Sequence, residues 1–155
     1  MQTTTMVRGR DEGEATWFFN ALMTTVASTA ETGGAYSLTE HLVTSASNPP
    51  MHVQVDEDEA FYILDGEVEF VVDGQTATAT AGTFAFVARG AAHTFRVQSD
   101  TARMLVICSG KPSDNLEDFF LGMGEPATER RLPPPGAPDL DRLAELCART
   151  GIELV

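Results

Sequence analysis

Short segments of alternating hydrophobic and polar residues cover the middle of the chain, from about residue 35 to residue 108. β-Branched and aromatic residues dominate these segments, and glycine-containing turns separate many of them. Strands are predicted at 35–43, 51–55, 59–64, 67–72, 75–80, 83–88, 93–97 and 102–108. The Asp73-Gly74 pair between two of them is a strong hairpin signal. Short strands at this close spacing, with no helix between them, predict an all-β antiparallel sandwich or barrel.

The two ends of the chain follow other patterns. Residues 14–30 are ambiguous, because Trp17 and the two phenylalanines after it suit either a strand or a short helix. After residue 110 the apolar positions take a helical period of i, i+3, i+4 and i+7. The first such stripe is Leu116, Phe119, Phe120 and Met123, and the second is Leu140, Leu143, Leu146 and Cys147. Asp139 is a suitable N-cap for the second helix, and Gly151 lies beyond its end.

We therefore predict one domain in three parts. An N-terminal segment, 1–34, packs on the barrel, residues 35–110 form the barrel core, and residues 111–155 form a helical extension. Amphipathic helices that follow a barrel most often pack against its outer wall. They can instead cover the barrel mouth or a dimer partner.

Composition and charge exclude several classes of protein. The 155 residues include 10 basic and 23 acidic ones, for a formal net charge of −13. Such a field repels phosphate backbones, so no nucleic acid partner is expected. The apolar runs are far shorter than the roughly 20 residues that span a bilayer, and the N-terminus lacks the apolar core of a signal peptide. Cys108 and Cys147 lack C-x-x-C spacing and are expected to be buried free thiols, so we expect a cytoplasmic protein.

Candidate metal ligands occur in the stretch PPMHVQVDEDEAF, residues 49–61. His52 and Gln54 are two residues apart and therefore share one face of a strand. Glu59 opens the next strand after a short turn, and His93 opens another strand much later. A divalent metal ion needs three or four such side chains within about 2.0–2.2 Å of it. Two histidines, a carboxylate and an amide could meet inside the barrel in this way.

The spacing of these residues resembles the two motifs of the cupin superfamily, which are small jelly-roll barrels. The first motif is H-x-H, three or four residues, E, six residues and G. Here His52-Val53-Gln54 is followed by four residues, Glu59, six more and Gly66. The second motif is G, five residues, P-x-G, two residues, H, three residues and N. The corresponding positions here are Gly82, Ala88-Arg89-Gly90 and His93. Looser similarity to small quercetin-dioxygenase-like bacterial cupins extends over most of the chain.

Three positions depart from the motifs: Gln54 replaces a histidine, Ala88 the proline and Val97 the asparagine. The resemblance implies a metal site made of His52, Gln54, Glu59 and His93, with iron, nickel, manganese or zinc as the ion. An amide oxygen is a weaker ligand than imidazole and suits harder cations. Gln54 is thus either an altered ligand in a working site or the mark of a site that has lost its metal.

Neighbouring polar residues have simpler interpretations. Asp56, Glu57 and Asp58 are expected to form a solvated turn, with Asp56 as the one substitute ligand to consider. His41 shares a strand face with Ser37 and Thr39, and we expect it at the surface or rim, with a pocket acid or base as the alternative. No G-x-S-x-G, P-loop or G-x-G-x-x-G motif occurs.

An apolar cavity with a few polar ligands suits a hydrophobic or aromatic small molecule. Its expected wall residues are Phe61, Phe70, Phe95 and Tyr36, with Phe84 or Phe86. The first hypothesis is a quercetinase-like dioxygenase in which Glu59 is a ligand or takes a proton from the substrate hydroxyl. The alternatives are a non-redox cyclase, isomerase or dehydratase, and a non-catalytic binding module. Similar proteins are often homodimers, which is our expectation here.

Overall fold

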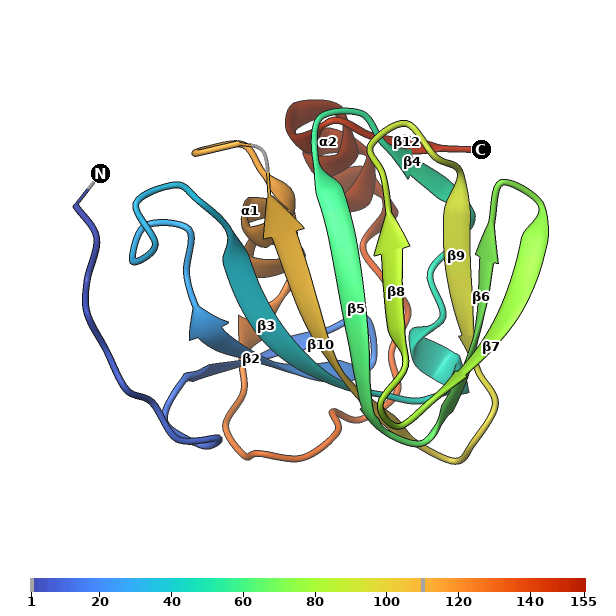
Figure 1. Ribbon diagram of the computed structural model, residues 1–155, viewed down its shortest axis with the longest axis horizontal. Coiled ribbons are helices and arrows are strands. Elements are labelled where there is room, and N and C mark those ends of the chain that lie inside the picture. Colours follow the sequence, from blue (N-terminus) through green and yellow to red (C-terminus); the bar gives the residue numbers. More distant parts are fainter. Residues whose placement is uncertain (1, 110) are drawn as a thin grey trace.

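A computed structural model describes residues 2–109 and 111–155 and shows two antiparallel sheets packed face to face (Figure 1). The seven-stranded sheet has the order β11 (Glu125–Pro126), β1 (Glu14–Phe18), β2 (Ala21–Ala27), β3 (Ser37–Val43), β10 (Ala102–Ser109), β5 (Asp58–Asp65) and β8 (Phe84–Val87). The five-stranded sheet has the order β12 (Ile152–Leu154), β4 (His52–Gln54), β9 (His93–Val97), β6 (Glu67–Val72) and β7 (Gln75–Thr80). The helices are α1 (Leu116–Met123), α2 (Leu140–Thr150) and a short 3₁₀ helix, Ser45–Ser47. The predicted all-β, jelly-roll-type fold with short C-terminal helices is confirmed.

The strands from β3 to β10 follow the predicted segments to within two residues at each end. Their alternation carries into the burial pattern, since every second residue of β10 is buried. The inward residues of both sheets form one hydrophobic core with side chains from the two helices.

The ambiguous N-terminal segment is a β-hairpin. Phe18 pairs with Ala21, so Phe19 and Asn20 form a two-residue turn between β1 and β2. Both turn residues have positive φ angles, 45° and 60°, as a tight hairpin turn of this kind requires. The hairpin belongs to the larger sheet through β2–β3 pairing. The N-terminal segment therefore extends the barrel wall rather than only packing on it.

The C-terminal extension covers the open end of the cavity described below. Asn115 caps α1, and Asp139 caps α2 as predicted. Gly151 ends α2 in the left-handed conformation, with φ of 74°, and turns the chain into β12. β12 pairs along its whole length with β4, the strand that carries His52 and Gln54. Residues of both helices line the cavity, so the helices do not pack on the outer wall, which was the first expectation.

Two further expectations concern the rest of the described chain. Cys108 and Cys147 are buried and free, as predicted. Neither α1 nor α2, nor any other helix among the described residues, has the length and hydrophobicity needed to cross a membrane.

Candidate metal centre and its cavity

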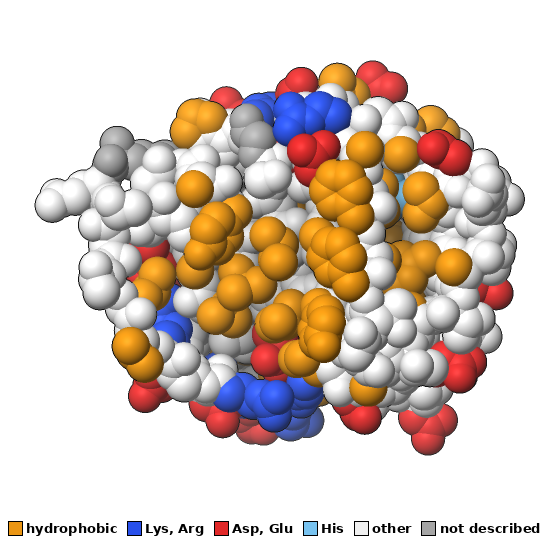
Figure 2. Space-filling model, viewed as in Figure 1, with side chains coloured by type: hydrophobic (Ala, Val, Ile, Leu, Met, Phe, Trp, Pro, Cys, Tyr) orange, Lys and Arg blue, Asp and Glu red, His pale blue; other side chains and the backbone are white. Residues whose placement is uncertain are grey.

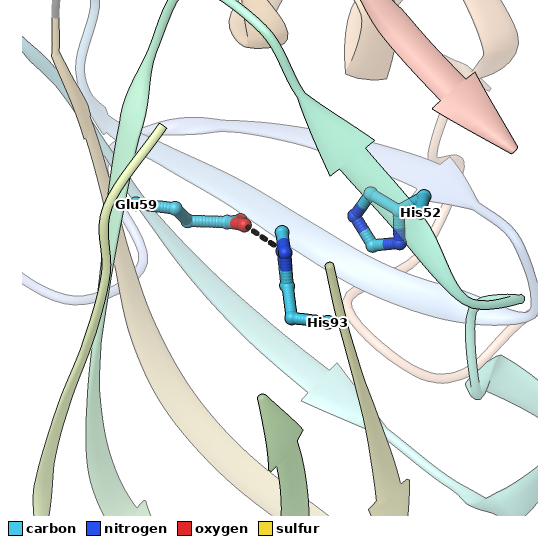
Figure 3. A group of neighbouring side chains, drawn as sticks. All are labelled: His52, Glu59 and His93. Atoms are coloured by element: carbon cyan, nitrogen blue, oxygen red, sulfur yellow. Dashed lines mark hydrogen bonds and ion pairs between the residues drawn. The ribbon is translucent and has the colours of Figure 1, made fainter. Parts of the chain in front are cut away.

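Three predicted ligands converge between the two sheets. His52 and His93 pair directly opposite each other on β4 and β9, and their ring centroids are 4.3 Å apart. Glu59 comes from β5 in the other sheet and points toward His93 (Figure 3). One ligand atom from each of the three residues lies within 4.8 Å of the other two. Ligand atoms on opposite sides of a metal ion at 2.0–2.2 Å are about 4.2 Å apart, so a small contraction would complete the site.

Strand alternation selects Glu59 from the run of four acids. In β5 the residues at 59, 61 and 63 are buried, while those between them face outward. Asp58, which faces outward, forms an ion pair with Arg89 at 2.9 Å. The carboxylate of Glu59 is thereby the only one of the run that enters the space between the sheets beside the histidines.

Backbone carbonyls fix the orientation of both imidazoles. Nδ1 of His52 lies 2.9 Å from the carbonyl oxygen of Pro50, and Nδ1 of His93 lies 3.0 Å from that of Ala91. A carbonyl only accepts, so each Nδ1 carries the proton and each Nε2 is directed to the shared site. Metal-bound histidines in proteins are held by the same kind of contact.

The pKa values of the two histidines are shifted in opposite directions. Burial and the nearby His93 lower the pKa of His52. Burial also acts to lower the pKa of His93, but the hydrogen bond and negative charge of Glu59 outweigh it, so that pKa is raised. Nε2 of His93 lies 3.2 Å from Oε2 of Glu59. The carboxylate of Glu59 therefore favours the protonated form of His93.

Gln54 is buried beside the three residues. Its Nε2 donates to Oε2 of Glu59 at 2.7 Å. Its Oε1 is enclosed and has no hydrogen-bond partner among the described residues. A buried unpaired oxygen is costly, and such atoms are uncommon in folded proteins. The donor set, two imidazoles and a carboxylate with this free amide oxygen next to them, fits a divalent first-row metal ion.

The acids before Glu59 lie outside this group. Asp56 is exposed and pairs with Lys111 at 3.2 Å, so it is no substitute ligand; β4 has already ended at Gln54 and the alternation does not continue. Glu57 differs from the predicted solvated turn, since it is buried and accepts from the backbone N–H of Leu116 at 2.6 Å. That carboxylate anchors the first turn of α1 to the loop before β5.

A cavity of about 360 Å³ opens next to the four polar residues. Its wall is mostly aromatic and aliphatic and draws on both sheets, both helices and β12. Of the predicted wall residues, Phe61 and Phe95 line it. Further aromatic wall residues, which the sequence analysis did not assign, are Phe18, Phe19, Phe119 and Phe120.

Four other aromatic residues do not line the cavity. Phe70 is buried in the core next to Phe61, with ring centroids 5.0 Å apart. Tyr36 precedes β3 and is 43% exposed, so its predicted place in the pocket is wrong. Phe84 and Phe86 are 60% and 57% exposed, because the alternation of β8 turns them to the outer face of the sheet.

His41 also lies where it was not expected. It is 5% exposed and forms part of the cavity wall, whereas the sequence favoured the surface or rim. Its neighbours Leu38 and Leu42 take the outer face of β3 with Glu40, so Ser37, Thr39 and His41 point inward. The alternation correctly grouped His41 with Ser37 and Thr39, and only the side of the sheet was wrong.

Comparisons with known proteins agree with this architecture. Residues 39–109 match the family described as the cupin domain. Quercetin 2,3-dioxygenase from Bacillus subtilis (strain 168) is 27% identical over 139 residues, which are 88% of this chain. The chain spans 40% of the length of that relative.

Solved structures share the fold at lower identity. A predicted oxalate decarboxylase from Thermotoga maritima superposes with a TM-score of 0.61 at 22% identity, over 68% of this chain and 99% of the other. The polyketide cyclase RemF from Streptomyces resistomycificus gives a TM-score of 0.58, also at 22% identity, over 68% and 79%. The family match, the two antiparallel sheets and the ligand spacing together identify residues 39–109 as a match to the cupin domain.

Proposed function

We propose that the protein is a metal-dependent cupin enzyme that acts on an apolar, oxygenated small molecule, with dioxygenase chemistry like that of its Bacillus relative. One observation carries the proposal: His52, Glu59 and His93 form a ligand group in the wall of an otherwise apolar cavity. Cavities of this size and character suit small aromatic molecules such as flavonoid-like or polyketide-like phenols.

The chain's own residues would divide the work as follows. Both histidines and Glu59 would hold the ion through Nε2 and carboxylate oxygen atoms, and Gln54 would complete the set through Oε1. A bound first-row ion would supply Lewis acidity and, if redox-active, reactivity toward O₂. The Glu59 carboxylate would accept the proton of a substrate hydroxyl. The phenylalanine wall would exclude water and hold the substrate ring.

Gln54 supports a second candidate, a non-redox cyclase, isomerase or dehydratase. An amide is a neutral ligand that donates less charge than the usual imidazole, and harder, redox-inert cations tolerate it better. In that case Glu59 or a histidine would move protons while the ion polarised a carbonyl group.

Metal analysis of untagged protein tests both candidates. The protein would be produced with iron, nickel, manganese and zinc available, alongside Glu59→Gln and a matched control, Glu67→Gln, on the exposed end of β6. We expect about one ion per chain in the wild type and the control, and a loss in Glu59→Gln. Metal-free wild-type protein would overturn both enzyme candidates and leave a binding module.

Oxygen uptake separates the two candidates. The metal-loaded protein would be mixed with quercetin in an oxygen-electrode cell, with Glu59→Gln as the inactive reference. Uptake that depends on Glu59 supports the dioxygenase. Stoichiometric metal without O₂ consumption by any phenol tested, together with conversion of a substrate under nitrogen, would favour the non-redox enzyme.

A further inference from the structure

A third histidine, His41, lies in the cavity wall on a different strand from the candidate metal ligands. Across β10, Glu59 of β5 is level with Ser37 of β3, because both pair with Cys108. His41 is four residues farther along β3 and is level with Ile63. At about 3.3 Å per strand residue, the backbone of His41 lies roughly 13 Å farther along the barrel wall than that of Glu59, and the side chains are nearer, since the charge of Glu59 still acts on the pKa of His41. The cavity wall therefore contains His41 as well as the candidate ligands, together with several phenylalanines and the polar residues Asn20, Ser47 and Asn48.

One nitrogen of His41 is already used by the protein. Nε2 lies 2.9 Å from Oγ1 of Thr39, which in turn lies 3.5 Å from the carbonyl oxygen of Val106. If Nε2–H donates to Thr39 and the Thr39 hydroxyl donates to Val106, each of these groups has a partner. This arrangement puts the proton of the neutral ring on Nε2 and leaves Nδ1 as an acceptor.

The other nitrogen faces the cavity. Within residues 2–109 and 111–155, Nδ1 of His41 has no protein partner. It is also absent from the fully enclosed polar atoms without a partner, which are Thr25 Oγ1 and Gln54 Oε1. A purely structural buried histidine would use both nitrogens, since buried polar atoms are rarely left unpaired. The open position of Nδ1 in the wall of a cavity points to a ligand.

The surroundings keep the ring fixed and neutral. The imidazole of His41 and the ring of Phe120 pack in an edge-to-face arrangement, with ring centroids 5.2 Å apart. Burial lowers the pKa of His41 to about 4, so its Nδ1 lone pair persists at neutral pH. An acceptor in an apolar wall discriminates strongly between ligands that can and cannot donate to it.

We infer that His41 is a substrate-binding residue whose Nδ1 accepts a hydrogen bond from a hydroxyl group at the end of the substrate distant from the metal ligands. The substrate is then an elongated, mostly aromatic molecule with oxygen substituents at both ends. This inference rests on the proposed function for the end held at Glu59, and it adds the specificity for the other end.

Anaerobic binding titrations test the assignment without turnover. The probes are quercetin and 3-hydroxyflavone, which lacks the remaining hydroxyl groups. A neutral hydrogen bond predicts that the wild-type protein prefers quercetin by roughly three- to tenfold. His41→Phe, which keeps the ring contact with Phe120, should bind both probes alike and retain its affinity for 3-hydroxyflavone.

Thr39→Val provides a second variant in case His41→Phe does not fold. It keeps the imidazole but removes the partner of Nε2, and the preference for quercetin should fall. Thr78→Val on the exposed strand β7 is the matched control and should keep the full preference. An unchanged preference in both His41→Phe and Thr39→Val, or in Thr39→Val alone if the first is unfolded, overturns the inference.

Metal content measured on the same samples keeps the two proposals apart. Metal-loaded wild-type protein without any preference between the probes refutes the role of His41 and leaves the proposed function standing. A preference that is lost in His41→Phe, in protein that binds no metal, supports the role of His41 and refutes the proposed function.

Discussion

Replacing Gln54 with leucine tests whether the amide is a metal ligand. In the metal-free protein the substitution removes the 2.7 Å hydrogen bond to Glu59. A hydrogen bond to a charged group contributes about 1.5–3 kcal/mol. The same substitution also removes the enclosed, unpaired Oε1, whose desolvation costs about 1–3 kcal/mol. The two effects offset each other, so the unfolding free energy of the metal-free variant should stay within about 1 kcal/mol of the wild type.

The metal-loaded protein should respond differently. If Oε1 binds the ion, it is no longer unpaired, and leucine only removes a ligand. Loss of a weak ligand should lower metal affinity by roughly 10–100-fold, as loss of supporting contacts does at other sites. That corresponds to about 1.4–2.8 kcal/mol. For a chain of this size 1 kcal/mol shifts Tm by about 2–4 °C, so the metal-induced rise in Tm should shrink by roughly 3–11 °C.

Thermal unfolding with and without the ion measures both quantities. Gln75→Leu, at an exposed position of β7, is the matched control and should behave as the wild type in both states. A full metal-induced rise in Gln54→Leu would show that the three other residues suffice and that the amide is no ligand. A metal-free Gln54→Leu less stable by 3 kcal/mol or more, an amount that exceeds the hydrogen bond alone, would show that Oε1 is not unpaired in solution.

Three further outcomes are expected. Folding lowers the pKa of His41 from 6.5 to about 4. The unfolded chain therefore binds that proton more readily, and the unfolding free energy should fall by about 3 kcal/mol as pH drops from 6.5 to 4. Urea unfolding at several pH values measures this for the metal-free wild type and for His41→Phe. The unfolding free energy of the variant should fall less over the same pH range. Deletion of residues 153–155 removes two of the three β12 residues that pair with β4 and should lower metal affinity at least tenfold by calorimetric titration, whereas unchanged affinity would show that these two pairs do not support the site. Sedimentation should give a homodimer that Phe84→Glu converts to monomer, while Val7→Glu, at an exposed site elsewhere, leaves it intact; a monomeric wild type would contradict this.

The sequence predicted the strands and the ligand group well because both depend on local spacing. Period-two alternation fixed the strands from β3 to β10 and placed His52 and Gln54 on one face. Four consecutive acids gave no hint of which one would turn inward, and only the position of Glu59 in β5, set by the motif spacing, distinguished it. Capping residues at 139 and 151 predicted the second helix for an equally local reason.

Long-range pairing explains what the sequence did not reveal. β12 has three residues and gains its partner, β4, from about a hundred residues earlier in the chain, so no local pattern marks it. The turn at Phe19 and Asn20 lacks the glycine that usually signals positive φ angles. Both features bear directly on the site, since β12 supports β4 and Phe19 lines the cavity.

The errors at His41, Phe84 and Phe86 concern which side of the seven-stranded sheet faces outward, and they share one cause. His41 was expected outside, and Phe84 or Phe86 inside, on the rule that polar residues face water. In this sheet the outer face is apolar: orange side chains gather over its centre in Figure 2, and Tyr62, Phe84 and Phe86 are each more than 40% exposed there.

An apolar outer face explains why the rule failed. Cross-strand pairs make it continuous, since Tyr62 pairs with Phe84 and also with Leu105. The Arg89–Asp58 and Arg103–Glu40 ion pairs neutralise their own charges within this same sheet, so a chain with net charge −13 can bring this face against an identical one. Contiguous exposed apolar surface of this kind marks an interaction site, and closed two-fold symmetry is the commonest way for identical chains to cover one. The inversion of β3 and β8 is therefore the sequence pattern expected of a sheet with a cavity on one side and an exposed apolar face on the other, and the homodimer predicted above would cover that face.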